Sequence, residues 1–375
     1  MSAVWESLLR MLALTRKELL AILKDPRSRI LLFVPPILQC LIFGYAATFD
    51  LSSVSYALMD QDRTAASHEL VARLDGSGVF HRVANLAGDG EIARIIDNRR
   101  ALLVLRIAPD FERRLQAGED APVQVIADGR NSNTAGVAMG YVNAVVSDFN
   151  VDWRAARGDP PPVIQPTLRA WYNPNLETRL NMIPALIATL TMMQTVMLTA
   201  LSVAREREQG TFDQLLVTPL RPGEIIVGKA APSMLVGLVQ ATNVLLVAQL
   251  WFHIPFQGSF LVLYTGLILF LLAAVGLGLF VSSIAQTMQQ AMLYTMLVMM
   301  PFMLLSGLTT PISSMPQVLQ DFTLINPLRW AIDITHRVYL EGVGLDRLLP
   351  DLVPLAAIGL VTLIGSSWMF QRRIA

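Results

Sequence analysis

The chain has 375 residues, of which 53% are hydrophobic and only 15% charged, and its formal net charge is zero. So few charges exclude an ordinary soluble protein and predict a membrane protein, while the zero net charge excludes a globally basic surface for nucleic acid. The single cysteine, Cys40, excludes an intrachain disulfide. Residues 1–29 mix charged with apolar residues, so we expect no cleavable signal peptide.

Residues 1–29 are expected to form a cytoplasmic, amphipathic interfacial helix. Its large apolar residues recur at helical spacing: Trp5, Leu8, Leu9, Leu12, Leu19, Leu20 and Leu23. Basic residues occupy other positions, which is typical of a helix that lies in the plane of the lipid headgroups. An ordinary packed helix is the alternative. Asp25-Pro26 should end the helix, because the residue before a proline disfavours the α conformation.

Six segments are expected to cross a membrane as helices. A spanning helix needs about 20 apolar residues, because its backbone must hydrogen-bond internally across the hydrocarbon. Four intervals contain no Asp, Glu, Lys or Arg: 30–49, 180–204, 230–320 and 352–371. Polar residues near 253–258 and 282–290 divide the longest interval into three spans. The expected spans are 30–49, 181–204, 229–251, 259–283, 288–308 and 352–371.

Lysines and arginines in short loops set the expected orientation. They occur in residues 1–29, in the loop 205–228 and in the tail 372–375. Six spans place these three segments on one side, so both termini are expected in the cytoplasm. Lys229 is expected to lie among the cytoplasmic headgroups, where the chain re-enters the membrane. The fold class is therefore an α-helical polytopic membrane protein.

Residues 50–180 are expected to form an inserted α/β extracytoplasmic domain. Apolar or alternating runs predict strands at 53–59, 101–107, 122–127 and 166–172. Helices are expected at 68–74, 109–115 and 131–157. The histidines of this domain, His68 and His81, stand apart from any cysteine or metal-spaced carboxylates, so we expect neither a catalytic nor a metal site there.

Gly223-x-x-x-x-Gly228-Lys229 is one residue short of a phosphate-binding P-loop. A P-loop needs a preceding strand, a following helix, and a Ser or Thr after the lysine to hold magnesium. Ala230 stands at that position, and Pro219 and Pro222 interrupt the place of the strand. We therefore expect this chain to bind neither ATP nor another cofactor and to have no enzymatic activity of its own.

The loop 205–228 is expected to carry a short helix over 212–217. Gly210 permits a turn before it, Thr211 can cap it, and Thr218-Pro219 should end it. Its apolar face would consist of Phe212, Leu215 and Leu216, and its polar face of Asp213 and Gln214. Such a helix is suited to docking on a partner protein. A plain interfacial loop is the alternative.

Several motifs follow one another along the chain. The loop reads Glu206-Arg-Glu-x-Gly-Thr-x-x-Gln-Leu-Leu-Val-Thr-Pro219, followed by Glu224 and Gly228-Lys229. The others are Tyr172-Asn-Pro174, Ser306-Gly-Leu-x-x-Pro-Ile-x-x-Met-Pro316 and Asn326-Pro-Leu328. This ordered set resembles ABC-2 type transporter permeases of the multidrug-export group over nearly the whole chain. Gln209 and Phe212 depart from the residues more frequent in that family, a basic or small residue and a leucine.

The resemblance implies the membrane subunit of an exporter in the cell (inner) membrane, which moves an apolar or amphipathic, drug-like or lipid-like substrate. It implies a second permease subunit, identical or not, and cytoplasmic ABC ATPase subunits that bind ATP and Mg. It also implies contact with membrane lipid, short re-entrant helices over 309–351, and room for a periplasmic adaptor (a membrane fusion protein). The residues that would couple to the ATPase are Glu206, Glu208, Gly210, Thr211, Phe212, Asp213, Gln214, Leu215, Leu216, Thr218 and Pro219.

Two sets of side chains are candidates for lining a transport pathway. The second expected span supplies Thr189, Gln194, Thr195 and Thr199, and the fifth supplies Met292, Met296, Met299 and Met303. Methionine suits promiscuous surfaces, but it also packs ordinary membrane cores, and polar side chains also bond between helices. No charge lies within the expected spans, which counts against proton or sodium coupling in a secondary transporter.

Two other classes of function stay open. A membrane-anchored sensor or assembly protein would bind a ligand with the external domain and recruit a cytoplasmic partner with the loop. A channel or secondary transporter is the third class. A neighbouring gene for an ATPase with Walker motifs would favour the exporter.

Overall fold

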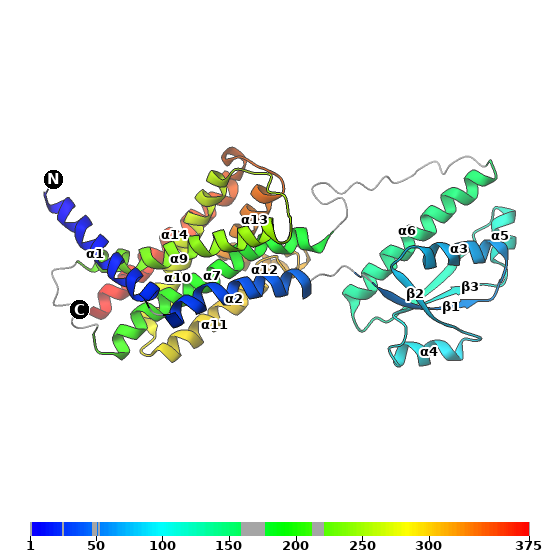
Figure 1. Cartoon of the computed structure of the whole chain (residues 1–375), viewed down its shortest axis with the longest axis horizontal. Helices are drawn as coiled ribbons and strands as arrows, with labels where there is room; N and C mark the ends of the chain where they lie inside the picture. The colour runs from blue at the N-terminus through cyan, green and yellow to red at the C-terminus, as the bar shows by residue number, and fades with distance from the viewer. Residues whose placement is uncertain are drawn as a thin grey trace. The chain divides into compact units, whose positions relative to one another are not determined.

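The computed structural model describes residues 2–24, 26–46, 51, 53–158, 177–211 and 221–374. The chain forms two compact units, one of residues 1–47 with 179–375 and one of residues 48–178. The first unit is helical and the second is an α/β unit (Figure 1).

The helical unit consists of long helices joined by short connections. It begins with α1 (Ser2–Lys24) and α2 (Pro26–Ala46). After the α/β unit follow α7 (Thr178–Glu208), α9 (Pro222–Leu250), α10 (Phe260–Ile284), α11 (Met288–Leu304) and α14 (Leu345–Ile374). Between α11 and α14 lie the shorter η1 (Ile312–Ser314), α12 (Gln317–Thr323) and α13 (Pro327–Tyr339).

Within the described residues, four helices are long and apolar enough to cross a membrane: α7, α9 from Gly223, α10, and α14 through Met369. Shorter apolar stretches lie in α2, at Phe33–Tyr45, and in α11. The chain is thus a helical membrane protein with several apolar helices. α9 starts before residue 229, and α14 extends beyond 352–371 at both ends. The expected spans stop at charged residues, whereas a helix can continue through charged turns outside the hydrocarbon.

α10 forms the centre of the helical unit, because most of its residues are buried against other helices. Glycines let these neighbours approach closely. A Cβ added at Gly278 of α10 would lie 2.6 Å from the Cβ of Thr199 in α7. A Cβ added at Gly237 of α9 would lie 2.5 Å from both the Cδ2 of Leu271 in α10 and the Oγ1 of Thr195 in α7. The missing side chains at these two positions let α7, α9 and α10 pack closely.

The α/β unit has a four-stranded sheet with the order β2-β1-β3-β4. Its elements are β1 (Val54–Asp60), α3 (Ala65–Gly76), β2 (Phe80–Asn85), α4 (Gly90–Asp97), β3 (Leu103–Ile107), α5 (Phe111–Ala117), β4 (Val123–Ala127) and α6 (Ser132–Ala156). β1 pairs in parallel with β2 and β3, and β4 pairs antiparallel to β3.

Both faces of this sheet carry a helical layer. α3 and α6 cover one face and α4 covers the other (Figure 1). Tyr56 of β1 is buried beneath α3, where its hydroxyl donates a hydrogen bond of 2.6 Å to Asp75. Burial and this bond raise the pKa of Tyr56. The polar edge strand β2 has no counterpart among the expected strands, because its sequence lacks an apolar run. The strand expected at 166–172 lies outside the described residues.

Candidate functional site

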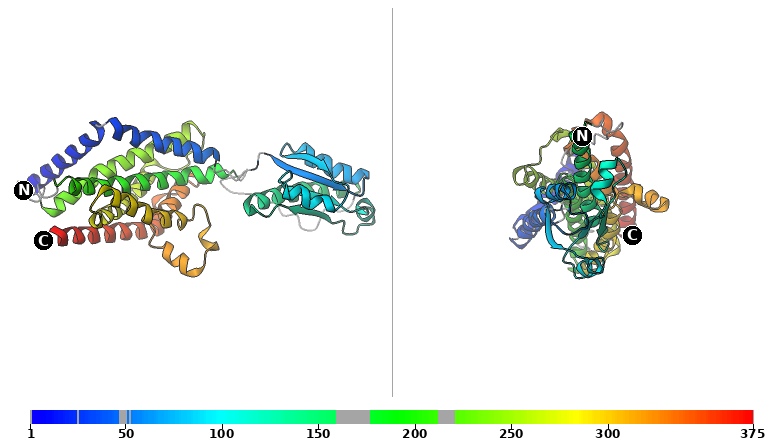
Figure 2. Two further views of the ribbon diagram at one scale, coloured as in Figure 1. Left: turned by 90° about the horizontal axis from the view of Figure 1, so that it is seen from below. Right: turned by 90° about the vertical axis from the view of Figure 1, so that its right-hand side faces the viewer.

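Several chain segments meet at one end of the helical unit. They are the start of α1, the end of α14, the turn between α10 and α11, and the ends of α7 and α9 that flank the loop (Figure 1 and Figure 2). Part of that loop lies outside the described residues, including the expected helix and Phe212, Asp213, Gln214, Leu215, Leu216, Thr218 and Pro219. The site is therefore built from the residues on either side of it.

α7 ends in a turn that requires glycine. Gly210 has a φ of 69°, a left-handed conformation that glycine adopts without steric strain. Its amide donates to the carbonyl oxygen of Arg207 at 3.1 Å, and the amide of Thr211 donates to that of Glu206 at 3.0 Å. The Thr211 hydroxyl also donates to the Glu206 carbonyl, at 3.3 Å. Within the described residues Thr211 thus closes the end of α7.

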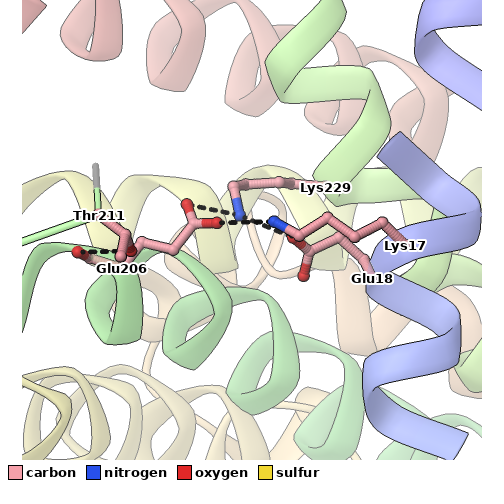
Figure 3. Close-up of polar contacts among 5 residues, drawn as sticks. All are labelled: Lys17, Glu18, Glu206, Thr211 and Lys229. Carbon is pink, nitrogen blue, oxygen red and sulfur yellow. Dashed lines mark hydrogen bonds and ion pairs between the residues drawn. The ribbon is translucent and has the colours of Figure 1, made fainter. Parts of the chain in front are cut away.

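A buried lysine joins three helices next to this turn (Figure 3). The Nζ of Lys229 in α9 lies 2.7 Å from Oε2 of Glu206 in α7 and 3.4 Å from Oε1 of Glu18 in α1. Lys17 of α1 approaches the other oxygen of Glu206, at 3.9 Å. The Lys229 side chain is only 1% exposed, whereas that of Lys17 is 63% exposed. The two lysines and two glutamates balance in charge.

Lys229 is expected among the cytoplasmic headgroups, but its side chain is instead buried within the chain, only 1% exposed. α9 begins at Pro222, so Lys229 is already inside the helix and its side chain points toward α7 and α1. Gly228 makes the close approach of α1 possible. A Cβ added there would lie 2.5 Å from the Cδ2 of Leu14 in α1, and Leu14 is itself buried.

A second polar contact joins α1 to the first turn of α9. The hydroxyl of Ser7 donates to Oε1 of Glu224 at 2.6 Å, and Nη2 of Arg10 lies 3.8 Å from the same oxygen. The other carboxylate oxygen of Glu224 accepts the backbone amide of Arg221 at 3.0 Å, which caps the start of α9. α1 thus contacts α9 at two separated points.

Two neighbouring residues of α7 hold the turn between α10 and α11. Nη1 of Arg207 lies 3.1 Å from the carbonyl oxygens of Ser282, Ser283 and Ala285, at the end of α10. The amide of Met288, at the start of α11, donates to Oε2 of Glu208 at 2.8 Å. A cation at the C-terminus of one helix and an anion at the N-terminus of the next both complement the helix dipoles.

Glu206 and Glu208 differ in their exposure to solvent, and so in whether a partner protein could contact them. Both carboxylates are engaged within the chain, but Glu206 is buried and Glu208 is exposed. Gly210 is exposed as well. The residues of the loop's first flank that are exposed to a partner protein are therefore Arg205 and the turn at 208–210.

The segment Gly223-x-x-x-x-Gly228-Lys229 forms the first turns of α9. A phosphate-binding loop would leave its backbone amides and its lysine free for the ligand. Here the helix contains the glycines, Gly228 packs on Leu14, and Lys229 is paired with Glu206. Gly228 and Lys229 therefore serve contacts between helices.

The candidate pathway residues lie in two different environments. Thr189, Thr195 and Thr199 of α7 are buried, and the hydroxyls of Thr189 and Thr199 donate to carbonyl oxygens of their own helix. Gln194 is half-buried. On α11, Met292, Met296 and Met303 are exposed, while Met299 is buried. The threonines of α7 thus pack inside the single chain, and most of the methionines face outward.

The contacts of α1 with α7 and α9 and the pairing of Lys229 were not predicted from the sequence. One signal was present, because Glu206 follows one charge-free interval and Lys229 precedes the next. Opposite charges at two adjoining helix ends can pair across the loop that connects them. The part played by Glu18 had no comparable signal, since it depends on how α1 packs.

Comparisons with known proteins agree over almost the whole chain. A family model described as ABC-2 family transporter protein matches residues 27–368. The chain is 40% identical over 366 residues to "Probable multidrug ABC transporter permease YbhR" of Escherichia coli (strain K12), covering 97% of this chain and 99% of the relative. It is 30% identical to "Probable multidrug ABC transporter permease YbhS" of that strain, covering 97% of each. It is 29% identical to that strain's "Inner membrane transport permease YhhJ", covering 82% and 83%.

Proposed function

The chain belongs to the ABC-2 family of transporter proteins, and we propose that it is the permease subunit of an exporter driven by a separate ATPase. Its substrate is apolar or amphipathic, drug-like or lipid-like, and leaves the cytoplasm or the inner leaflet. The multidrug permeases among its relatives support this substrate class. The observation that carries the proposal is the arrangement of the helix ends that flank the loop: α1 contacts the end of α7 and the start of α9, and the end of α7 contacts the α10–α11 turn.

Six helices cross the membrane in the proposed arrangement. They are the four long apolar helices together with the shorter apolar stretches of α2 and α11. The loop 205–228 and both chain ends lie in the cytoplasm, which the lysines and arginines at this end support. The α/β domain 50–180 and the re-entrant segment 309–351 then lie outside. The inner membrane is the location, in line with the name of one relative.

The loop is proposed to couple ATP hydrolysis to transport. In this proposal ATP and Mg bind to the ATPase subunit, in line with the packing of Gly228 on Leu14 and the pairing of Lys229 with Glu206 in this chain. The exposed turn with Glu208 and Gly210 directly precedes residues 212–217, for which the sequence predicts the docking helix. Motion of the ATPase would reach the helices through Arg207 and Glu208, which hold the α10–α11 turn.

The proposed pathway lies between two permease subunits. The outward-facing methionines of α11, Met292, Met296 and Met303, would be covered by a second copy or a related subunit. Soft methionine side chains suit substrates of varied shape. The buried threonines of α7 would support the pathway from behind. The exposed apolar residues of α1, including Trp5, Leu8 and Leu12, would enter the lipid surface, and the external domain would meet a periplasmic adaptor.

Co-purification tests this function directly. The full-length chain is produced with an ABC ATPase encoded next to its gene, and ATP-driven uptake of the dye Hoechst 33342 is followed in inverted membrane vesicles. We expect a stable complex and dye uptake that ends when the Walker lysine of the ATPase is replaced. Uptake that persists without ATP, or that a protonophore abolishes while ATP remains, would instead identify a secondary transporter. A chain that binds no ATPase and moves no dye would point to the sensor or assembly protein.

A further inference from the structure

The buried ammonium of Lys229 connects the two helices that flank the coupling loop. Glu206 lies at the end of the helix that enters the loop, and Lys229 lies near the start of the helix that leaves it. Their 2.7 Å ion pair closes the base of the loop (Figure 3). Separation of the two helices would break this buried ion pair, which is unfavourable because both charges would remain away from water. The flanks of the loop are therefore held as one body.

α1 completes this arrangement from a distant part of the sequence. Glu18 provides a second carboxylate for Lys229 at 3.4 Å, and Lys17 provides a second cation for Glu206 at 3.9 Å. Each buried charge thus has one partner across the base of the loop and one on α1. A helix that only covered the lipid surface would need no such charges on its inner face.

Packing supports the same connection. Leu14 of α1 fills the space that the missing side chain of Gly228 leaves, one residue before Lys229. Farther along, Ser7 is bonded to Glu224 at the start of α9. Displacement of α9 relative to α1 would break an apolar contact, a hydrogen bond and an ion pair together.

We propose that α1 is a moving part of the coupling unit, and that Lys229 and Glu206 are positioning residues that make α1, the end of α7 and the start of α9 move together. The proposal rests on the function proposed above, in which an ATPase displaces the loop. It adds a route by which that displacement reaches α1, and with it the surface of the membrane.

Neutral variants of the pair test the coupling. The double variant Glu206→Gln with Lys229→Met removes both charges and so leaves neither buried unpaired. The quantity measured is the amount of Hoechst 33342 taken up per ATP hydrolysed by the full complex in vesicles. We expect this ratio to fall about fivefold or more, which is the low end of typical coupling effects. Lys24→Met, at an exposed lysine of α1 outside this cluster, is the matched control and should change this ratio less than about twofold. An unchanged ratio in the double variant would overturn the proposal.

A disulfide between α1 and α9 can replace the ion pair as their connection. It tests whether the neutral double variant loses transport because this connection is lost or because the protein is less well folded. With Cys40 replaced by Ser, the pair Leu14→Cys and Gly228→Cys can form a disulfide, since a Cβ at 228 would lie 3.0 Å from that of residue 14. Disulfides usually join Cβ atoms about 3.5–4.5 Å apart, so a small shift suffices. Oxidation should leave transport intact in an otherwise unchanged chain and should reverse most of the fall in the neutral double variant. Reduction should reverse the rescue.

Other results of these experiments would contradict either the proposal about α1 or the proposed function. If oxidation stops dye uptake while the ATPase stays bound and hydrolyses ATP, α1 and α9 must separate during transport and the proposal is wrong. If no ATPase associates with the unchanged chain, the proposed function itself fails. If the disulfide does not form, the ratio measured for the neutral double variant still decides.

Discussion

The Nζ of Lys229 and the Oε2 of Glu206 lie 2.7 Å apart, although the whole connection between α7 and α9 separates them along the chain. Both side chains are buried in the helical unit. A buried ion pair stabilises a protein little compared with a packed apolar pair, because both charges lose their water. The loss of one partner alone is costly, since the other charge stays buried and unpaired. The two residues should therefore behave as a unit.

Unfolding measurements should reveal this interdependence. We expect Lys229→Met and Glu206→Gln each to lower the free energy of unfolding by about 3 kcal/mol, as for other buried pairs that lose one partner. The double variant should lose at least about 1 kcal/mol less than the sum of the two, because it leaves no uncompensated charge. Unfolding of the detergent-solubilised variants is monitored by the helical circular dichroism signal. A double-mutant cycle then gives the coupling free energy between the two residues. Strict additivity would show that the pair does not act as a unit.

Close helix packing predicts a different result at Gly278. Its replacement by Ala would place a Cβ 2.6 Å from the Cβ of Thr199 and 2.9 Å from the carbonyl oxygen of Val196. Overpacking of this kind costs about 1–3 kcal/mol, which should appear as a lower thermal midpoint. Gly365→Ala is the matched control, because position 365 is also helical but has no atom within 4 Å of the added Cβ. Equal midpoints for the two variants would contradict tight packing of α7 on α10.

Much of the fold follows from apolar runs that are long enough to show in the sequence. α7 and α10 lie where charge-free intervals predict spans, and β3 lies where a continuous apolar run predicts a strand. β2 could not be found in this way, because it is a polar edge strand whose place is set by pairing with β1. The length of α9 was underestimated, since its first turns carry Glu224 and the paired Lys229.

The site was harder to predict, because it depends on contacts between distant segments. Gly210 and the charges around it mark a turn at the end of a span, which the sequence indicates locally. The inward position of Lys229 depends on α1 packing on Gly228, and no local pattern encodes that contact. The helical spacing of the methionines of α11 does not tell which of them face inward. In the single chain Met299 is buried and Met296 is exposed.

A pH effect is expected from Asp333 of α13. Arg329 and Arg337 lie one turn away on the same helix, and Asp351 of α14, ion-paired with Arg337, faces it. Burial, together with the charge of Asp351, raises the pKa of Asp333 to about 6, although both arginines oppose the shift. In the unfolded chain an aspartate ionises near pH 4, so the folded protein loses stability as the pH rises from about 4 to 6 and beyond.

The substitution Asp333→Asn should remove this loss. We expect the variant to be more stable than the unchanged chain at pH 8, by at most about 3 kcal/mol, and equally stable near pH 4. Thermal midpoints of both proteins, measured in detergent at pH 4.5 and 8, test the difference. Asp321→Asn, at an exposed acid of α12, should show no such dependence. A stability difference that is the same at both pH values would rule out the raised pKa as its cause.

The turn at Gly210 offers a test that separates docking from stability. Gly210→Val forces a β-branched residue into a φ of 69°, which costs about 1–2 kcal/mol of strain or moves the chain out of this conformation. Gly158 of the α/β unit has nearly the same φ, 73°, and also has no atom within 4 Å of an added Cβ, so Gly158→Val imposes the same strain elsewhere. Both variants should lose similar stability. Only Gly210→Val should lower the yield of ATPase that co-purifies with the chain, because only the turn at Gly210 leads into the docking segment. Equal ATPase yields from the two variants, at equal protein yield, would mean that the loop after α7 does not dock the ATPase.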